Sequence, residues 1–207
     1  MKSSAEPRRV VLASGNRGKL AEFNALLAQW SYDVIPQSAL DVVPAEETGS
    51  TFVENALLKA RSAAQQSGLP ALADDSGISV DALDGAPGIF SARYAGDTAN
   101  PKANNLKLLD ALQGVPPANR SARFHCALVF LHGPDDANPI ICESEWEGRI
   151  LLEPEGDGGF GYDPIFYSLE HGCSAAALDS ETKNRDSHRG KALSALLAAL
   201  AHEHRQP

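Results

Sequence analysis

Two adjacent carboxylates in the middle of the chain have the position and spacing to hold a divalent cation. The apolar residues 71–73 lead directly into Asp74 and Asp75, and Ser76 and Gly77 follow. A strand that delivers acids to a tight turn can hold a hard cation against a phosphate, and such a turn leaves backbone N–H groups for an anion. The spacing therefore predicts a metal- and phosphate-binding turn, with a solvated acidic turn as the simpler alternative.

A glycine-containing segment near the N-terminus has the features of an anion-binding loop. The segment SGNRGK, residues 14–19, lies between an expected strand over 10–13 and an expected helix over 19–30. Its glycines let the backbone approach a ligand, the helix N-terminus attracts negative charge, and Lys19 adds a cation. The spacing is not the GxxxxGK pattern of a Walker-type loop. An ordinary strand–helix turn is the alternative.

Two further acids precede an expected helix. Glu46 and Glu47 lie in a polar loop and could supply a third carboxylate to a cation at Asp75. Magnesium accepts few protein ligands, keeps several waters and takes phosphate oxygens for the rest, so one or two acids suffice. The alternative is a solvated acidic loop.

The segment GGFGYDPIF combines glycines with aromatic residues. Phe160 and Tyr162 in a glycine-rich loop suit stacking on a flat base, with Asp163 beside them. A hairpin corner filled by its own aromatic side chains is an equally good interpretation.

A cationic cluster lies at the start of the expected C-terminal helix over 187–204. Lys183, His188 and Arg189 would oppose the helix dipole there, and a bound anion or oxo group would remove that conflict. The alternative is surface charge behind a Ser187 cap. The other histidines show no metal-ligand spacing and are expected in the core or on the surface: His125, His132, His171, His202 and His204.

A serine hydrolase is disfavoured. Ser76 and His188 could form part of a catalytic triad, but the chain lacks GxSxG. The two carboxylates directly before Ser76 would also oppose a developing oxyanion.

Helices and strands that must position these residues alternate early in the chain, and strands cluster in its middle. This order predicts a mixed α/β fold. One helix begins with a capping box at Thr51 and Glu54 and ends at Gly68. The other expected elements are strands over 34–36, 122–131, 140–147 and 149–152, and a helix over 100–112 with Leu106 and Leu109 directed inward.

Bulk composition narrows the class of protein. The chain has 207 residues and a formal net charge of −9. This negative charge argues against a protein that binds nucleic acid over a broad surface, since such a surface must be basic. Three widely spaced cysteines fit a reducing cytoplasm, and residues 1–9 read as a polar leader before a single domain over 10–207. The leader has no apolar signal-peptide core, and the longest apolar stretch is too short to span a membrane.

The motifs together resemble a known family. SGNRGK, TFVENALLKA, ADDSG followed by APGIFSARYAG, GFGYDPIF and SHRGKAL occur in this order, from Val10 to about Leu200. They are similar to those of the non-standard purine nucleoside triphosphate pyrophosphatases, the inosine/xanthosine triphosphatase family. Each motif is weak alone, but the set in register is highly specific.

The resemblance implies an elongated α/β fold in which two lobes surround a long mixed β-sheet, with the substrate in a cleft between the lobes. It implies a homodimer and magnesium (Mg2+)-dependent cleavage of ITP, XTP and their deoxy forms to the monophosphate and pyrophosphate. Asp75 matches the catalytic acid and metal ligand, and Glu46 matches a candidate second metal ligand. The substrate-binding positions implied by the motifs are Ser14, Gly15, Asn16, Arg17, Gly18, Lys19, Ser76, Phe160, Gly161, Tyr162, Asp163, Lys183, His188 and Arg189.

Two alternatives stay open beside this interpretation. One is a pyrophosphatase for other damaged or pyrimidine nucleotides, and the other is a nucleotide-sensing protein that binds without turnover. The carboxylates Asp74, Asp75 and Glu46 favour an enzyme over a sensor. Neither alternative involves nucleic acid or a membrane.

Overall fold

A seven-stranded mixed β-sheet is the centre of the computed structural model, which describes residues 8–27, 32–98 and 100–203. This confirms the predicted mixed α/β class. The strand order is β2-β1-β3-β4-β5-β6-β7, with parallel pairing at β1–β2 and β1–β3 and antiparallel pairing at β5–β6 and β6–β7. The strands are β1 (Arg8–Leu12), β2 (Tyr32–Pro36), β3 (Ala71–Val80), β4 (Ser121–Leu131), β5 (Ile140–Ile150), β6 (Phe166–Ser168) and β7 (Cys173–Ser174).

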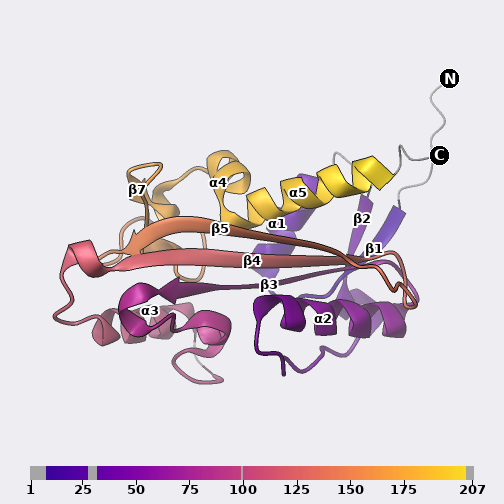
Figure 1. Cartoon of the computed structure of the whole chain (residues 1–207), viewed down its shortest axis with the longest axis horizontal. Helices are drawn as coiled ribbons and strands as arrows, with labels where there is room; N and C mark the ends of the chain where they lie inside the picture. Colours follow the sequence, from indigo (N-terminus) through magenta and orange to yellow (C-terminus); the bar gives the residue numbers. More distant parts are fainter. Residues whose placement is uncertain (1–7, 28–31, 99, 204–207) are drawn as a thin grey trace. The chain divides into compact units, whose positions relative to one another are not determined.

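Helices connect and flank these strands (Figure 1). The α-helices are α1 (Arg17–Leu27), α2 (Phe52–Ser67), α3 (Pro101–Ala111), α4 (Ser180–Asp186) and α5 (His188–Glu203). Short 3-10 helices are η2 (Gln37–Leu40), η3 (Asp81–Leu83), η4 (Gly88–Arg93), η5 (Pro117–Asn119), η6 (Asp163–Ile165) and η7 (Ala175–Ala177). Within the described ranges, none of the helices is long and apolar enough to cross a membrane.

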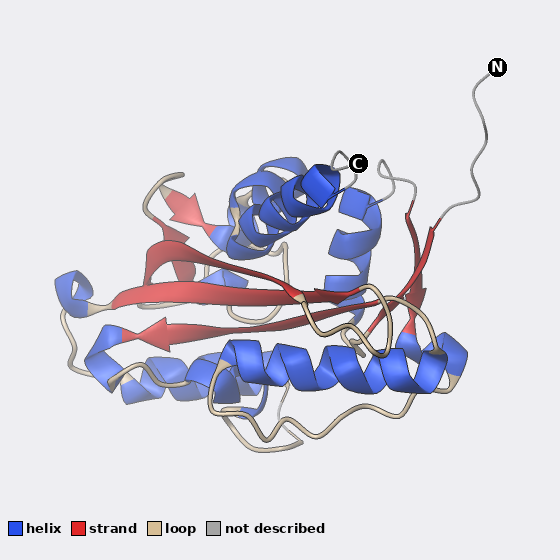
Figure 2. Ribbon diagram, turned by 45° about the vertical axis from the view of Figure 1, so that its right-hand side comes forward, coloured by secondary structure: helices blue, strands red, loops and turns tan. Residues whose placement is uncertain are grey.

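The chain divides into two compact units. The first takes residues up to 75, 127–142 and those from 193 onward, and the second takes 76–126 and 143–192. The long strands β3, β4 and β5, drawn in red in Figure 2, each contribute residues to both units. The boundary in β3 falls between Asp75 and Ser76, so these two consecutive residues belong to different units.

The predicted capping box of α2 is confirmed in its main feature. Thr51 is the N-cap, and its Oγ1 accepts a hydrogen bond from the backbone N–H of Glu54. The Glu54 carboxylate reaches back to Ser50, accepting from its N–H at 2.6 Å and its hydroxyl at 2.7 Å. Gly68 ends the helix in the left-handed conformation at φ +68°, which glycine adopts without steric cost.

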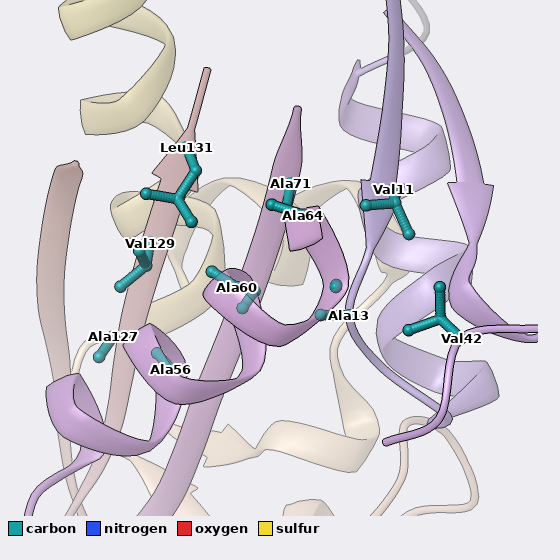
Figure 3. Close-up of a cluster of buried hydrophobic side chains, with 12 residues drawn as sticks. Val11, Ala13, Val42, Ala56, Ala60, Ala64, Ala71, Ala127, Val129 and Leu131 are labelled. Atoms are coloured by element: carbon teal, nitrogen blue, oxygen red, sulfur yellow. The ribbon is translucent and has the colours of Figure 1, made fainter. Parts of the chain in front are cut away.

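An alanine face explains how closely α2 approaches the sheet in the first unit. Ala56, Ala60 and Ala64 of α2 are fully buried in one cluster with side chains from β1, β3 and β4 (Figure 3). Small side chains let the helix backbone lie close to the strands, so polar groups on the same helix can reach the sheet.

The second unit has an aromatic core. Phe124, Trp146 and Phe166 pack on one another, with ring centroids 4.5 to 6.3 Å apart. The helix predicted from Asn100 is confirmed as α3, whose first N–H groups are capped by the Asn100 side chain. The prediction that Leu106 points inward is wrong, since its side chain is 53% exposed and Leu108 is buried instead.

The predicted turn at the acidic pair is also wrong. Residues 74–77 lie inside β3, which continues without interruption from Ala71 to Val80. The strand can carry two acids because each finds a lysine partner, as described below.

The two expected strands over 140–147 and 149–152 form one strand, β5. Gly148, the residue between the two expected strands, lies in the paired region opposite Ser168 of β6. A Cβ at this position would collide with the Phe166 ring and the Tyr167 carbonyl oxygen, so glycine serves close packing here.

Two predictions at chain ends are affected by the described ranges. The helix expected over 19–30 begins earlier, at Arg17, and its expected end lies outside the described residues. Residues 1–7 of the expected leader also lie outside them, but the predicted leader extends too far, since Arg8 and Arg9 belong to β1. The expected C-terminal helix is α5, preceded by the separate short helix α4.

Candidate functional site

Asp74 and Asp75 face different partners in the first unit. Successive side chains of a strand point to opposite faces of the sheet. Asp74 forms an ion pair with Lys19 of α1, and Asp75 Oδ1 accepts a hydrogen bond from Lys59 Nζ of α2 at 2.7 Å. Both acids are buried. The two neighbours in sequence therefore do not form a carboxylate pair around one cation.

Lys59 joins Asp75 to a second acid. Its ammonium also donates to Glu47 Oε1 at 2.8 Å. The two carboxylates raise the pKa of Lys59 above its usual value although burial, the largest single influence, lowers it. Burial raises the pKa of Asp75, and Lys59 and Lys19 oppose that rise. The group is a charged cluster with an acid on either side of one ammonium.

Of the two acids in the preceding loop, Glu47 is the one bound to Lys59. Glu46, which the resemblance suggested as a metal ligand, is exposed. Asn55, fully buried on α2, accepts the backbone N–H of Gly49 at 2.8 Å and so ties the end of this loop to the helix. A Cβ on Gly49 would meet the Glu54 side chain at 2.7 Å, which explains the glycine.

Sequence reasoning missed Lys59. It lies within TFVENALLKA, three residues after Ala56 and one before Ala60, which are both buried in the alanine cluster. A lysine on or beside the inner face of an otherwise apolar helix is the signal that could have identified it, since a buried ammonium needs an acidic partner.

The segment 14–19 holds its own backbone in place. The Asn16 side-chain oxygen accepts from the N–H of Gly18 at 2.9 Å and of Lys19 at 3.2 Å. Ser14 Oγ in turn accepts from the Asn16 N–H at 3.2 Å. Gly15 has open space where a Cβ would lie, so packing alone does not require glycine there. The side chain of Arg17 lies outside what the structure describes.

In the second unit, the Asp163 carboxylate holds the glycine–aromatic loop together through its hydrogen bonds. Its Oδ2 accepts from the backbone N–H of Phe160 and from Lys183 Nζ, both at 2.7 Å. Lys183 Nζ lies 4.6 Å from the centroid of the Phe160 ring, and Arg189 Cζ lies 5.6 Å from it. Gly159, at φ +69°, packs directly against Asp163 and leaves no room for a Cβ. Residues predicted from separate motifs thus meet around Phe160.

Tyr162 differs from Phe160 in its environment. Its ring belongs to the aromatic core, its hydroxyl donates to the Ser91 carbonyl at 2.7 Å, and burial raises its pKa. The Asn105 side chain of α3 donates to the Gly161 carbonyl at 3.1 Å. Phe160, in contrast to Tyr162, is half-buried. The loop therefore combines the two interpretations given above: Tyr162 fills the core, and Phe160 stays partly accessible for stacking.

His188 and Arg189 begin α5 and are both buried. The His188 ring stacks on Phe124 with centroids 4.7 Å apart and planes 10° apart. Arg189 Nη2 donates to Ser76 Oγ at 3.1 Å. Gly190 touches the Asn184 carbonyl so closely that no side chain fits, which lets α4 and α5 meet at Ser187. Cations at this helix start are therefore held inward by packing.

The second unit contains another group of potential metal ligands. Glu170, His171 and Asp186 offer ligand atoms within 4.8 Å of one another. Asp186 already accepts two hydrogen bonds from Arg185, at 2.8 and 2.7 Å, and Lys191 approaches Glu170 to 4.0 Å. These acids therefore have cationic partners within the fold.

Comparisons with known proteins agree on one family. A sequence profile of the Ham1 family matches residues 10–199. The dITP/XTP pyrophosphatase of Vibrio parahaemolyticus is 54% identical over 194 residues, covering 94% of this chain and 97% of that protein. The dITP/XTP pyrophosphatase of Xanthomonas oryzae pv. oryzae is 57% identical, covering 91% and 95%. Among solved structures, a HAM1 protein from Coxiella burnetii has a TM-score of 0.87 at 51% identity, covering 94% and 99%.

Proposed function

The chain belongs to the Ham1 family, and on this basis we propose that it hydrolyses non-standard purine nucleoside triphosphates (dITP, ITP, XTP and dXTP) to the monophosphate and pyrophosphate. The names of relatives that share more than half of its residues support the substrate class. Removal of these nucleotides would keep them out of DNA and RNA. We further propose that the protein works in the cytoplasm as a homodimer.

The Glu47–Lys59–Asp75 cluster is the observation that carries the proposal. Carboxylate oxygens are the ligands that Mg2+ prefers. One oxygen of Glu47 and one of Asp75 lie within 2.8 Å of the Lys59 ammonium. Glu47 and Asp75 would hold the metal, and Glu47 replaces Glu46 as the proposed second ligand. When bound, Mg2+ supplies positive charge that neutralises the phosphate oxygens.

Asp75 has the environment of a group that positions or deprotonates water. Burial raises the pKa of its carboxyl, which makes it a better proton acceptor than an exposed aspartate. In the proposed reaction, water attacks the α-phosphorus, Asp75 orients that water or takes its proton, and pyrophosphate leaves. Lys19, the last residue of the 14–19 segment, would stabilise the negative charge of the triphosphate.

The Phe160 cluster is proposed to bind the nucleoside. A half-buried aromatic ring suits stacking on a purine, and Arg189 can only donate hydrogen bonds. Donors opposite C6 match the 6-oxo group of hypoxanthine and xanthine and oppose the 6-amino group of adenine. Lys183 is held by Asp163, and its Nζ also lies near the Phe160 ring, so it would assist Arg189.

We propose that both sets of residues act on one nucleotide. Asp75 and Ser76 are consecutive in β3, and the Ser76 hydroxyl accepts a hydrogen bond from Arg189. A proposed phosphate-binding residue is therefore next in sequence to a residue that contacts the proposed base-binding arginine. Ser76 then contacts the substrate instead of acting as a nucleophile.

A pyrophosphate-release assay on a nucleotide panel tests the proposal. With magnesium, dITP, ITP and XTP are expected to be turned over and ATP to be a poor substrate. Omission of magnesium should abolish release. Preferred turnover of pyrimidine or other damaged nucleotides would support the alternative substrate class, and tight binding without release would support a sensor.

A further inference from the structure

The ammonium of Lys59 lies where a divalent cation shared by Glu47 and Asp75 would have to lie. Nζ is 2.8 Å from Glu47 Oε1 and 2.7 Å from Asp75 Oδ1. The side chains of Lys59 and Asp75 are only 12% and 9% exposed, and that of Glu47 is 28% exposed. The same two carboxylate oxygens therefore already have a cationic partner supplied by the chain itself.

A metal and this ammonium cannot both occupy the space between the acids. Magnesium would need oxygen ligands at about 2.0–2.1 Å, which is shorter than the present N–O contacts. A divalent cation beside a positively charged lysine would also meet strong repulsion in a partly buried site. Lys59 must leave the carboxylates before one cation can bridge them.

The side chain is suited to leave. Lysine has a flexible four-carbon stem and a compact ammonium group. This group can exchange one oxygen partner for another. Its backbone is fixed, because α2 is capped at Thr51 and packed through its alanines. The loop that carries Glu47 is tied to the same helix by Asn55. Movement of the lysine side chain alone would free both acids.

We propose that Lys59 is a built-in counter-cation that keeps Mg2+ off the free protein and moves to a phosphate oxygen when the metal–nucleotide complex binds. This rests on the proposed function. The metal then binds tightly only together with a triphosphate, and the two acids are never left without a cation. As a consequence of this one lysine, the affinity for metal is low without nucleotide and high with it.

Binding of Mn2+, followed by the electron paramagnetic resonance signal of the free ion, tests this without any turnover. Wild type without nucleotide is expected to bind Mn2+ weakly, and Lys59→Met to bind it roughly tenfold or more tightly, because one adjacent positive charge is removed. Arg61→Met is the matched control: it removes a positive charge from the same helix and should leave Mn2+ affinity at the wild-type value.

The double variant Lys59→Met/Glu47→Gln locates the gain. Its Mn2+ affinity should fall back to the wild-type value, since one of the two ligands is lost. Lys59→Arg, which keeps the charge, should stay weak. Equal affinity of wild type and Lys59→Met, in variants whose circular dichroism shows the native fold, would overturn the proposal, as would a gain that survives Glu47→Gln. Pyrophosphate release by the wild type tests the proposed function separately, so the two can fail independently.

Discussion

Asp75 is the residue on which the proposed chemistry depends most. Asp75→Asn keeps the shape of the side chain and removes the charge that would bind metal and activate water. We expect turnover of ITP to fall on the order of a hundredfold or more. The measurement is pyrophosphate release at saturating magnesium, with circular dichroism to confirm the fold. Near-normal turnover would refute the assigned role.

Arg189 is the residue we expect to select the base. Its replacement by alanine should lower kcat/KM for ITP and narrow the ratio of ITP to ATP, because donors that favour a 6-oxo group are removed. Hydrogen-bonding sites can discriminate by roughly 10⁴-fold, far more than an apolar pocket. Both nucleotides should be measured in wild type and variant. If the ratio of kcat/KM for ITP to that for ATP is unchanged, Arg189 does not select the base, and we would assign that role to the loop around Phe160.

At the residue level, sequence could name groups but not pairings. Residue type and motif identify Asp75, Lys183 and Arg189, and the Asp163–Lys183 ion pair of 2.7 Å joins two of the predicted positions. Glu47 and Lys59 became prominent only in three dimensions, because the choice between adjacent acids depends on which one the loop turns toward the helix.

At the level of elements, Gly148 makes a prediction about how β5 and β6 pack. Gly148→Ala would place a methyl group against the Phe166 ring and the Tyr167 backbone. We expect a loss of about 1–3 kcal/mol in the free energy of unfolding, the usual cost of overpacking. Urea denaturation measures it. Gly133→Ala, where a Cβ has open space, is the control and should change little.

Local signals predicted the helices better than the strands. Thr51, Asn100 and Gly68 act through hydrogen bonds and backbone conformation within a few residues, so their effect is visible in sequence. The continuation of β3 through Asp74 and Asp75 depends on lysines from α1 and α2, which lie far away in the chain. A pair of acids followed by serine and glycine looks like a turn until those partners are known.

At the level of the whole molecule, exposed apolar side chains support the proposed homodimer. Phe90 and Leu106 of the second unit are 54% and 53% exposed. We expect light scattering at micromolar concentration to give the mass of two chains, and Phe90→Glu/Leu106→Glu to reduce it to one. Val43→Glu, an equally apolar exposed site in the first unit, is the control. A wild-type mass of one chain would exclude the dimer.

The fold class followed from the alternation of elements, and the family from motifs spread over most of the chain. The cleft between two lobes stays a prediction from the resemblance. What sequence could not supply is the neighbourhood of each charge, since a strand places neighbours on opposite faces and helices bring their partners from elsewhere.

The site of water attack tests the central claim most directly. ITP should be hydrolysed by the wild type with magnesium in water labelled with heavy oxygen, and the products analysed by mass spectrometry. Attack at the α-phosphorus predicts one labelled oxygen in the monophosphate and unlabelled pyrophosphate. Label in pyrophosphate, or release of single phosphates, would contradict the account.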